Sequence, residues 1–222
     1  MRIIYPASRF TESTSVGVRP KKLKDLVSGQ FWLSVGTIEP RKNQKLLARA
    51  YARYLALGGD PMTLVFAGGT GWKMDGFEAY VDSLGISEHV IMTGYVSDDE
   101  LIWLYRNCYA NIYPSLFEGF GLPVLEGMQF GAPTIASNST SIPEVTGDAA
   151  LLISPGDIEA WSQGMLQFSK KQNLRDSYKE KATVQAERFS WKSTTASLLE
   201  LYHDAVNQPK REICGSERST MF

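Results

Sequence analysis

The chain of 222 residues is 43% hydrophobic and 21% charged and carries a formal net charge of −1, the composition of a globular protein that can bury a substantial core. The near-zero net charge removes the electrostatic case for nucleic acid or an acidic membrane as the main partner. Because it contains no run of about 18 apolar residues and no apolar N-terminal core, the sequence predicts neither a transmembrane segment nor a signal peptide, and we expect a cytoplasmic protein.

The first thirty residues predict a connection rather than a folded unit. Residues 3–6 have the composition of the end of a strand. A Ser/Thr-rich stretch at 11–15 and a basic run at 19–24 follow, with few apolar side chains, as in an exposed linker. We therefore expect residues 1–30 to be the remnant of an interdomain linker or hinge.

From residue 31 the chain alternates short apolar runs, most of them closed by glycine, with segments of helical spacing. The predicted strands are 31–35, 64–67, 90–93, 110–113, 133–136 and 150–153. The predicted helices are 43–57, 97–107, 123–130, 157–169, 172–188 and 191–207. A polar tail at 208–222 is expected to fray.

This repeat of strand, glycine and helix predicts the fold class. Strands that are apolar on both faces indicate a parallel sheet covered by helices on both sides. We expect an α/β domain over residues 31–207, a Rossmann-like open parallel sheet with its ligand at the carboxyl ends of the strands. The segments that fall at such ends are 36–42, 68–72, 94–97 and 114–126.

The stretch 114–126 is the strongest candidate for chemistry. It places the glycine loop 119–121 at a strand end and Pro123 at the expected first position of a helix, so that backbone amides are free to hold an anion. Glu118 and Glu126 would repel a bare phosphate, but a ligand that carries both phosphates and hydroxyls, such as a nucleotide-sugar, suits both glutamates. The alternative is a plain turn in which Glu118 caps the helix and Glu126 is solvated.

A second candidate lies after the first strand. Arg41 and Lys42 stand at a helix N-terminus, where cations oppose the helix dipole. Their position is explained if an anion binds beside them, because hydrogen bonds to charged groups contribute about 1.5–3 kcal/mol each. The alternative is that both cations are solvated.

Metal binding is not indicated. The acidic residues 98–100 follow Ser97 in the pattern of a capping box, which explains them without an ion. His89 and His203 are isolated and predicted to be structural or surface residues. Cys108 and Cys214 are predicted to be unpaired thiols in a reducing compartment, and we expect neither metal nor cofactor.

The residues 94–155, and above all Pro-Ser-x-x-Glu-Gly-Phe-Gly-Leu-Pro-x-x-Glu at 114–126, resemble the C-terminal domain of glycosyltransferase family 4, which are retaining enzymes of GT-B architecture. The resemblance covers about residues 31–192. It includes the segments 34–36, 40–43, 131–133, 143–145 and 147–149.

The resemblance implies two Rossmann-like domains, an N-terminal one for the acceptor and a C-terminal one for the nucleotide-sugar. This chain resembles the second, so the missing acceptor-binding half, or a partner chain in its place, is an expected partner. Peripheral association with a membrane would come through that half.

The resemblance also implies roles for individual residues. Arg41 and Lys42 would hold the donor diphosphate with the amides of 119–122, Glu118 would accept hydrogen bonds from the sugar and act catalytically without being a covalent nucleophile, and Glu126 would bind the ribose. Many relatives carry arginine where this chain has Thr37. The implied donor-binding residues are Gly36, Thr37, Arg41, Lys42, Gly94, Tyr95, Val96, Glu118, Gly119, Phe120, Gly121, Leu122 and Glu126.

The function implied is transfer of a hexose to a glycan or lipid-linked acceptor, with electrostatic stabilisation of the departing nucleoside diphosphate and retention of configuration. The segments 36–43 and 68–72 resemble mannosyl- and rhamnosyltransferase-like members, which favours GDP-mannose over a UDP-hexose. The alternatives are a non-catalytic nucleotide-sugar-binding module or regulatory subunit, and a relative that isomerises or hydrolyses nucleotide-sugars.

Overall fold

The computed structural model describes residues 2–10, 15–71 and 76–207. Six strands form one parallel sheet in the order β3-β2-β1-β4-β5-β6. All six strands were predicted to within one residue at each end, and they are β1 (Phe31–Val35), β2 (Thr63–Ala67), β3 (Val90–Gly94), β4 (Ala110–Tyr113), β5 (Thr134–Ser137) and β6 (Ala150–Ile153).

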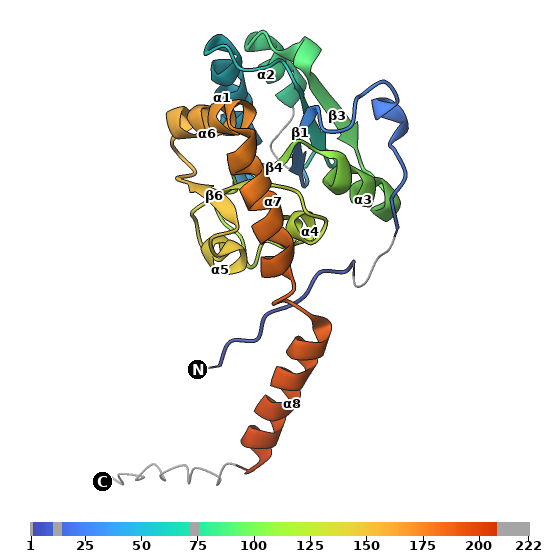
Figure 1. Cartoon of the computed structure of the whole chain (residues 1–222), viewed down its shortest axis with the longest axis vertical. Helices are drawn as coiled ribbons and strands as arrows, with labels where there is room; N and C mark the ends of the chain where they lie inside the picture. Colours follow the sequence, from blue (N-terminus) through green and yellow to red (C-terminus); the bar gives the residue numbers. More distant parts are fainter. Residues whose placement is uncertain (1, 11–14, 72–75, 208–222) are drawn as a thin grey trace, which may run out of the picture.

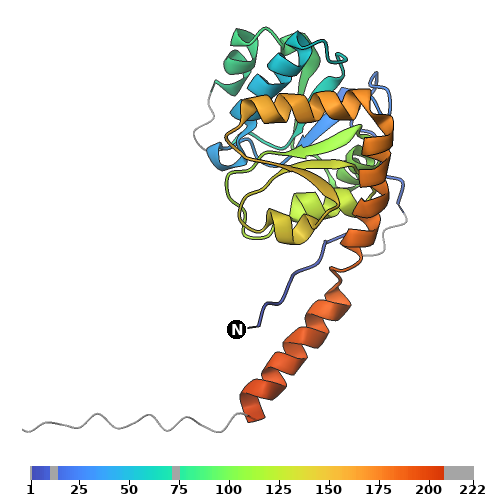
Figure 2. The same ribbon diagram turned by 60° about the vertical axis from the view of Figure 1, so that its left-hand side comes forward.

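Helices cover both faces of the sheet, as predicted (Figures 1 and 2). One face packs against α1 (Gln44–Ala56), α2 (Phe77–Ser83) and α6 (Ile158–Lys170). The other face packs against α3 (Asp98–Asn107), α4 (Leu122–Gln129), α5 (Ile142–Thr146) and α7 (Gln172–Ala186).

The central strand β1 explains why apolar runs in the sequence predicted the strands correctly. All five of its residues are buried. Trp32 belongs to the cluster beneath α1, whereas Phe31 and Leu33 belong to the cluster beneath α3, because successive side chains of a strand point to opposite faces. A fully buried apolar side chain of this size stabilises the fold by about 1.5–3 kcal/mol.

The strand order creates a topological switch point between β1 and β4. The chain leaves β1 toward β2 on one side, and later returns to add β4 on the other side, where Trp32 pairs with Ala110. In open α/β sheets the ligand crevice lies outside the carboxyl ends of the strands at such a point. A ligand site is therefore expected at the loops after β1 and β4.

Local details differ from the sequence predictions. Helices α2 and α5 were not predicted, nor were the short 3₁₀ helices η1 (Lys21–Leu23), η2 (Pro40–Lys42) and η3 (Ser87–His89). Helix α4 begins at Leu122, one residue early, so Pro123 occupies its second position. The capping box at the start of α3 is confirmed, because Ser97 and Glu100 each accept a hydrogen bond from the other's backbone amide.

The N-terminal residues are more ordered than an exposed linker. The strand end predicted at 3–6 is wrong, because these residues run beside a helix and pair with no strand. Phe10 and Leu23 are buried in the cluster beneath α3, so the expected exposure is wrong for them. The amide of Val18 donates to the carbonyl of Asp99 at 2.9 Å. The domain boundary at residue 30 stays a prediction.

Helix α8 (Trp191–Asn207) extends away from the body and buries none of its residues (Figures 1 and 2). The N-terminal segment, residues 2–10, lies beside it: Arg2 pairs with Asp204 at 3.2 Å and Thr194 donates to the carbonyl of Tyr5 at 2.7 Å. No helix in the described ranges is long and apolar enough to cross a bilayer. The predicted tail with Cys214, the stretch 11–14 and Trp72 lie outside the described residues.

Candidate functional site

The loops after β1 and β4 are bonded to each other at the switch point. The carbonyl of Arg41 accepts hydrogen bonds from the amide of Leu116 at 2.8 Å and from the hydroxyl of Ser115 at 3.1 Å. Residues far apart in the sequence, from the β1 loop and the β4 loop, are thereby held in one cluster.

Asn43 fixes the direction of the first loop. It ends η2 in the left-handed conformation (φ 60°), which asparagine tolerates better than most residues. Its Nδ2 donates to the carbonyls of Pro114 at 3.1 Å and Pro155 at 2.7 Å. One side chain therefore joins the loops that follow β1, β4 and β6.

Glu118 lies at the centre of this cluster. Its Oε1 accepts hydrogen bonds from Lys42 Nζ at 2.8 Å, the Tyr113 hydroxyl at 2.9 Å and the Ser115 hydroxyl at 2.6 Å. Its Oε2 is 2.9 Å from Nη1 of Arg41. The side chains of Glu118 and Lys42 are only 9% and 12% exposed. The two cations, which were predicted to hold a diphosphate, thus both contact Glu118 in this structure. The alternative of a solvated cation is wrong for Lys42.

The protonation of the cluster follows from these contacts. Burial alone would raise the pKa of Glu118, but the hydrogen bonds from Lys42, Ser115 and Tyr113 outweigh burial and lower it. Burial raises the pKa of Tyr113, and the neighbouring charge of Glu118 raises it further. At neutral pH Glu118 is therefore a carboxylate and Tyr113 a neutral phenol.

The glycine loop presents free donors beside this carboxylate. Within the described part of the chain, the backbone amides of 119–122 have no hydrogen-bond partner. Gly121 caps α4 with a φ of +102°, a conformation that favours glycine. Ser141 donates to the carbonyls of Glu118 and Phe120 at 3.1 and 3.0 Å and so fixes the loop. These amides and the positive end of α4 suit an anion.

The remaining glycines bring neighbouring loops together. A Cβ on Gly68 would lie 2.2 Å from the carbonyl oxygen of Gly36, so the ends of β1 and β2 approach as only glycine allows. The amide of Gly68 donates to the carbonyl of Gly94 at 3.0 Å. Thr37 is exposed beside Gly36. Gly94 ends β3, and Tyr95 (87% exposed) and the half-buried Val96 follow it. Among the described residues, no hydrogen bond or ion pair joins these three to the Glu118 cluster.

Glu126 lies apart from the cluster, buried on the inner side of α4. Its Oε2 accepts a hydrogen bond from the Tyr105 hydroxyl at 3.3 Å, and its Oε1 is 3.5 Å from Nε of Arg9. Burial raises its pKa, although Arg9 and Tyr105 oppose the rise. The interpretation of a solvated Glu126 and a capping Glu118 is therefore wrong, because Glu126 is buried and no side chain caps α4.

Sequence reasoning missed several residues that build the site. Tyr113 was interpreted only as a strand residue, and Ser115 only as part of a motif. The hydroxyl-rich stretch 139–141, directly after β5, was a usable signal because it ends at the same sheet edge. Arg9 gave no signal.

Metal ligands are not gathered anywhere in the described ranges, where no group of three or more His, Cys, Asp or Glu side chains could hold an ion. His89 lies in η3 and His203 on the exposed surface of α8. Cys108 is buried, and burial raises its pKa to about 12.

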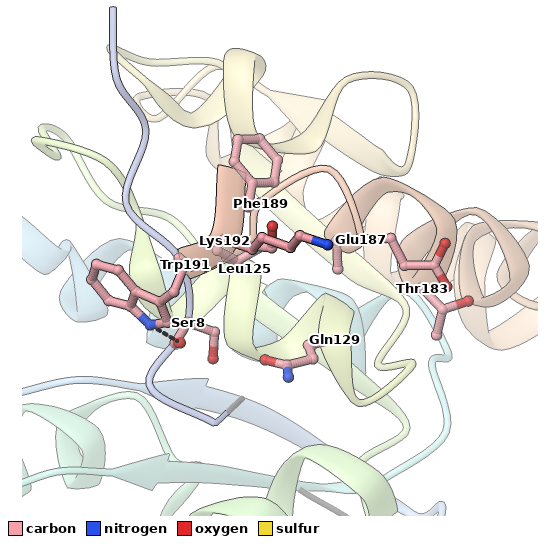
Figure 3. Close-up of a pocket in the computed structure, with 11 residues that line it drawn as sticks. Ser8, Leu125, Gln129, Thr183, Glu187, Phe189, Trp191 and Lys192 are labelled. Carbon is pink, nitrogen blue, oxygen red and sulfur yellow. Dashed lines mark hydrogen bonds between the residues drawn. The ribbon is translucent and has the colours of Figure 1, made fainter. Parts of the chain in front are cut away.

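A cavity of about 680 Å³ lies elsewhere, between the N-terminal segment, α4, and the junction of α7 and α8 (Figure 3). Ser8, Gln129, Phe189 and Trp191 line it, and the Trp191 indole donates to the carbonyl of Ser8 at 2.9 Å. Neither Lys42 nor Glu118 lines it. The candidate site is therefore the open sheet edge, and not this cavity.

Comparison with known proteins identifies the family of the chain. Residues 20–185 match the family described as glycosyl transferases group 1. O-antigen chain mannosyltransferase B of Escherichia coli is 37% identical over 172 residues, which are 78% of this chain and 45% of that protein. The serotype-specific mannosyltransferase WbdA of Escherichia coli is 36% identical over 212 residues, 90% of this chain and 25% of that protein. The chain thus spans half or less of the length of these relatives.

Solved structures agree in fold. A glycosyltransferase from Rickettsia africae superposes with a TM-score of 0.79 at 18% identity, over 94% of this chain and 58% of that one. Anabaena Alr3699/HepE in complex with UDP and glucose gives 0.77 at 17% identity, over 91% and 57%. The match over 20–185 and the E. coli relatives carry the conclusion: this chain belongs to the glycosyl transferases group 1 family and has the Rossmann-like α/β fold of a GT-B-type glycosyltransferase.

Proposed function

We propose that the chain is the donor-binding half of a retaining hexosyltransferase. The observation that carries the proposal is the cluster at the switch point, where Arg41 and Lys42 contact Glu118 and the free amides of 119–122 follow it in the same loop. Cations and amides are the groups that hold a diphosphate, and a carboxylate is the group that accepts hydrogen bonds from sugar hydroxyls.

The contacts of Glu118 suggest how a donor would be accommodated. Oε1 is occupied by three donors, so it fixes the carboxylate in place. Oε2 is held by Arg41, which is 43% exposed and has a second acceptor in Glu39. We propose that Arg41 turns to the diphosphate when the donor binds, and that this movement frees Oε2 for the sugar.

The reaction proposed is cleavage of the bond between the anomeric carbon and the diphosphate oxygen, with the electron pair leaving on the nucleoside diphosphate. Arg41, Lys42 and the amides of 119–122 stabilise the charge that develops on this leaving group. The acceptor hydroxyl attacks from the same face and gives its proton to the departing diphosphate oxygen, so that configuration is retained. Glu126 is proposed to bind the ribose, and the backbone of 94–96 to face the base.

The identity of the donor is proposed from the relatives. Those reported above from Escherichia coli are named as mannosyltransferases, which favours GDP-mannose over a UDP-hexose. The proposed acceptor is a glycan or a lipid-linked sugar. Because the chain spans half or less of these relatives' length, we propose that an N-terminal half, on this or another chain, supplies the acceptor site.

A thermal-shift panel of GDP, UDP, ADP and dTDP tests the proposal. A ligand at 100 times its Kd stabilises the folded state by about 2.7 kcal/mol, which raises the Tm by several degrees for a domain of this size. We expect GDP to give the largest rise. No rise with any of the four nucleotides would contradict the proposed function.

A radiolabel transfer assay with GDP-mannose tests the division of labour. The 222 residues alone are expected to transfer little or no mannose, and the chain combined with its acceptor-binding half is expected to transfer it. Efficient transfer by the chain alone would contradict the need for a second half. Binding without transfer in the combined protein would favour the non-catalytic module instead.

A further inference from the structure

Glu126 is paired with a cation from the N-terminal segment, residues 2–10. Its two oxygens face the Tyr105 hydroxyl at 3.3 Å and Arg9 Nε at 3.5 Å, and its side chain is 6% exposed. Arg9 is the cation paired with it among the residues that the structure describes. A buried carboxylate without a cation is costly, so this pairing decides whether Glu126 stays ionised.

Arg9 is itself fixed at its other end. Its Nη2 lies 3.2 Å from Oδ1 of Asp98, the first residue of α3. Its guanidinium lies 4.8 Å from the ring centroid of Phe10, which is buried against Phe130. Arg9 therefore spans the start of α3 and the inner side of α4.

The rest of the N-terminal segment is fastened beside the glycine loop. The ring of Tyr5 packs against Phe120 of that loop and against Phe189, at centroid distances of 6.0 and 5.6 Å. Its hydroxyl donates to Glu144 at 3.0 Å. The carbonyl of Phe10 accepts a hydrogen bond from Gln129, on the last turn of α4. The segment thus contacts the glycine loop at Phe120 and α4 at Glu126 and Gln129.

We propose that Arg9 is a positioning residue of the donor site, which holds the Glu126 carboxylate toward the ribose and makes residues 2–10 part of that site. This inference rests on the proposed function. It adds a residue that lies outside the matched range 20–185 and outside the motifs of the sequence.

The inference gives a pH dependence with a definite sign. The titratable and charged groups around Glu126 are Arg9 from the N-terminal segment, Tyr105 and Asp98 from α3, and Tyr113 from β4. Burial raises the pKa of Glu126 and Arg9 opposes that rise. Loss of Arg9 therefore raises the pKa further. A protonated carboxyl accepts fewer hydrogen bonds from a ribose. As the pH is lowered, the nucleotide affinity of a variant without Arg9 should therefore begin to fall at a higher pH than that of the wild type.

The test is GDP and UDP titration calorimetry of the full chain between pH 5 and pH 8, with the Glu126 carboxyl followed by carbon NMR. The Arg9→Gln variant is expected to bind about tenfold more weakly at pH 7, the scale of one charge-assisted hydrogen bond. The pH midpoint of binding and the Glu126 titration should both move upward. Arg9→Lys should restore most of the affinity, and Lys21→Gln, which removes an exposed charge from the same region, should match the wild type.

Wild-type affinity and an unchanged midpoint in Arg9→Gln would overturn the inference while leaving the proposed function intact. Failure of the wild type to bind any of GDP, UDP, ADP and dTDP would overturn the proposed function and this inference with it. Because Arg9 is half exposed, Arg9→Gln is expected to fold, and loss of the folded state on circular dichroism would also contradict a positioning role.

Discussion

The two glutamates of the 114–126 stretch are separated by seven residues, yet their surroundings are opposite. Glu118 receives four hydrogen bonds or ion-pair contacts from the loop after β1, from the end of β4 and from the loop after β4, and its pKa is lowered. Glu126 has one phenol and one longer contact to Arg9, and its pKa is raised by burial. The contacts of Glu118 favour its ionised form, whereas the burial of Glu126 penalises its ionised form.

This difference shows how the site is divided between parts of the chain. The Glu118 cluster is assembled by elements within the matched range 20–185, at the switch point of the sheet. The partner of Glu126 comes from residues before that range. A fragment limited to residues 20–185 would keep the contacts of Glu118 and lose the contact between Arg9 and Glu126.

The largest effect is expected for Glu118→Gln. Removing one partner of a buried, hydrogen-bonded ion pair costs about 3–5 kcal/mol, and we expect a loss near the lower end because Arg41 still reaches solvent. Urea unfolding at pH 7 measures it. Because the folded pKa lies below the ordinary 4.5, the stabilisation is present above pH 4.5 and is lost as pH falls through the folded value. The gap between variant and wild type should shrink in acid, and a gap under 1 kcal/mol at pH 7 would contradict the account.

An intermediate effect is expected at Asn43, which holds the Glu118 cluster together. In Asn43→Asp a carboxylate faces two carbonyl oxygens and loses both hydrogen bonds, so unfolding free energy should fall by about 2 kcal/mol. Asn43→Gly loses the same hydrogen bonds without the repulsion and keeps the left-handed backbone, so its loss should be smaller. Equal stability of Asn43→Asp and wild type in urea would show that the amide does not join the three loops.

The smallest effect is expected for Glu126→Gln. Since burial penalises the charged form, the neutral isostere should be neutral or up to about 1 kcal/mol more stable at pH 7. The folded pKa of Glu126 lies above 4.5, so its penalty is full above the folded value and is relieved as pH falls toward 4.5. The stability difference between variant and wild type should therefore vanish in acid. A loss above 2 kcal/mol at pH 7 would show that the ionised Glu126 stabilises the fold.

The sequence predicted the sheet well because central parallel strands are buried on both faces, and β1 reads as one apolar run. Helices α2 and α5 were missed because seven and five residues are too few to show a helical period. The left-handed Asn43 and the hydroxyls of Tyr113 and Ser115 act through contacts between distant loops, which no local pattern encodes. Arg9 contacts Glu126 from a segment more than 100 residues away in the sequence, next to Phe10, which packs against Phe130.

The central claim is that the Glu118 cluster holds a nucleoside diphosphate, and titration calorimetry of GDP and UDP at pH 7.5 tests it most directly. Lys42→Ala removes the cation bonded to Oε1 of Glu118, whereas Lys45→Ala removes an exposed cation that lies over Tyr80. One charged hydrogen bond contributes about 1.5–3 kcal/mol, so Lys42→Ala should weaken binding by about 10- to 100-fold while Lys45→Ala matches the wild type. Equal affinities in all three proteins would contradict the account.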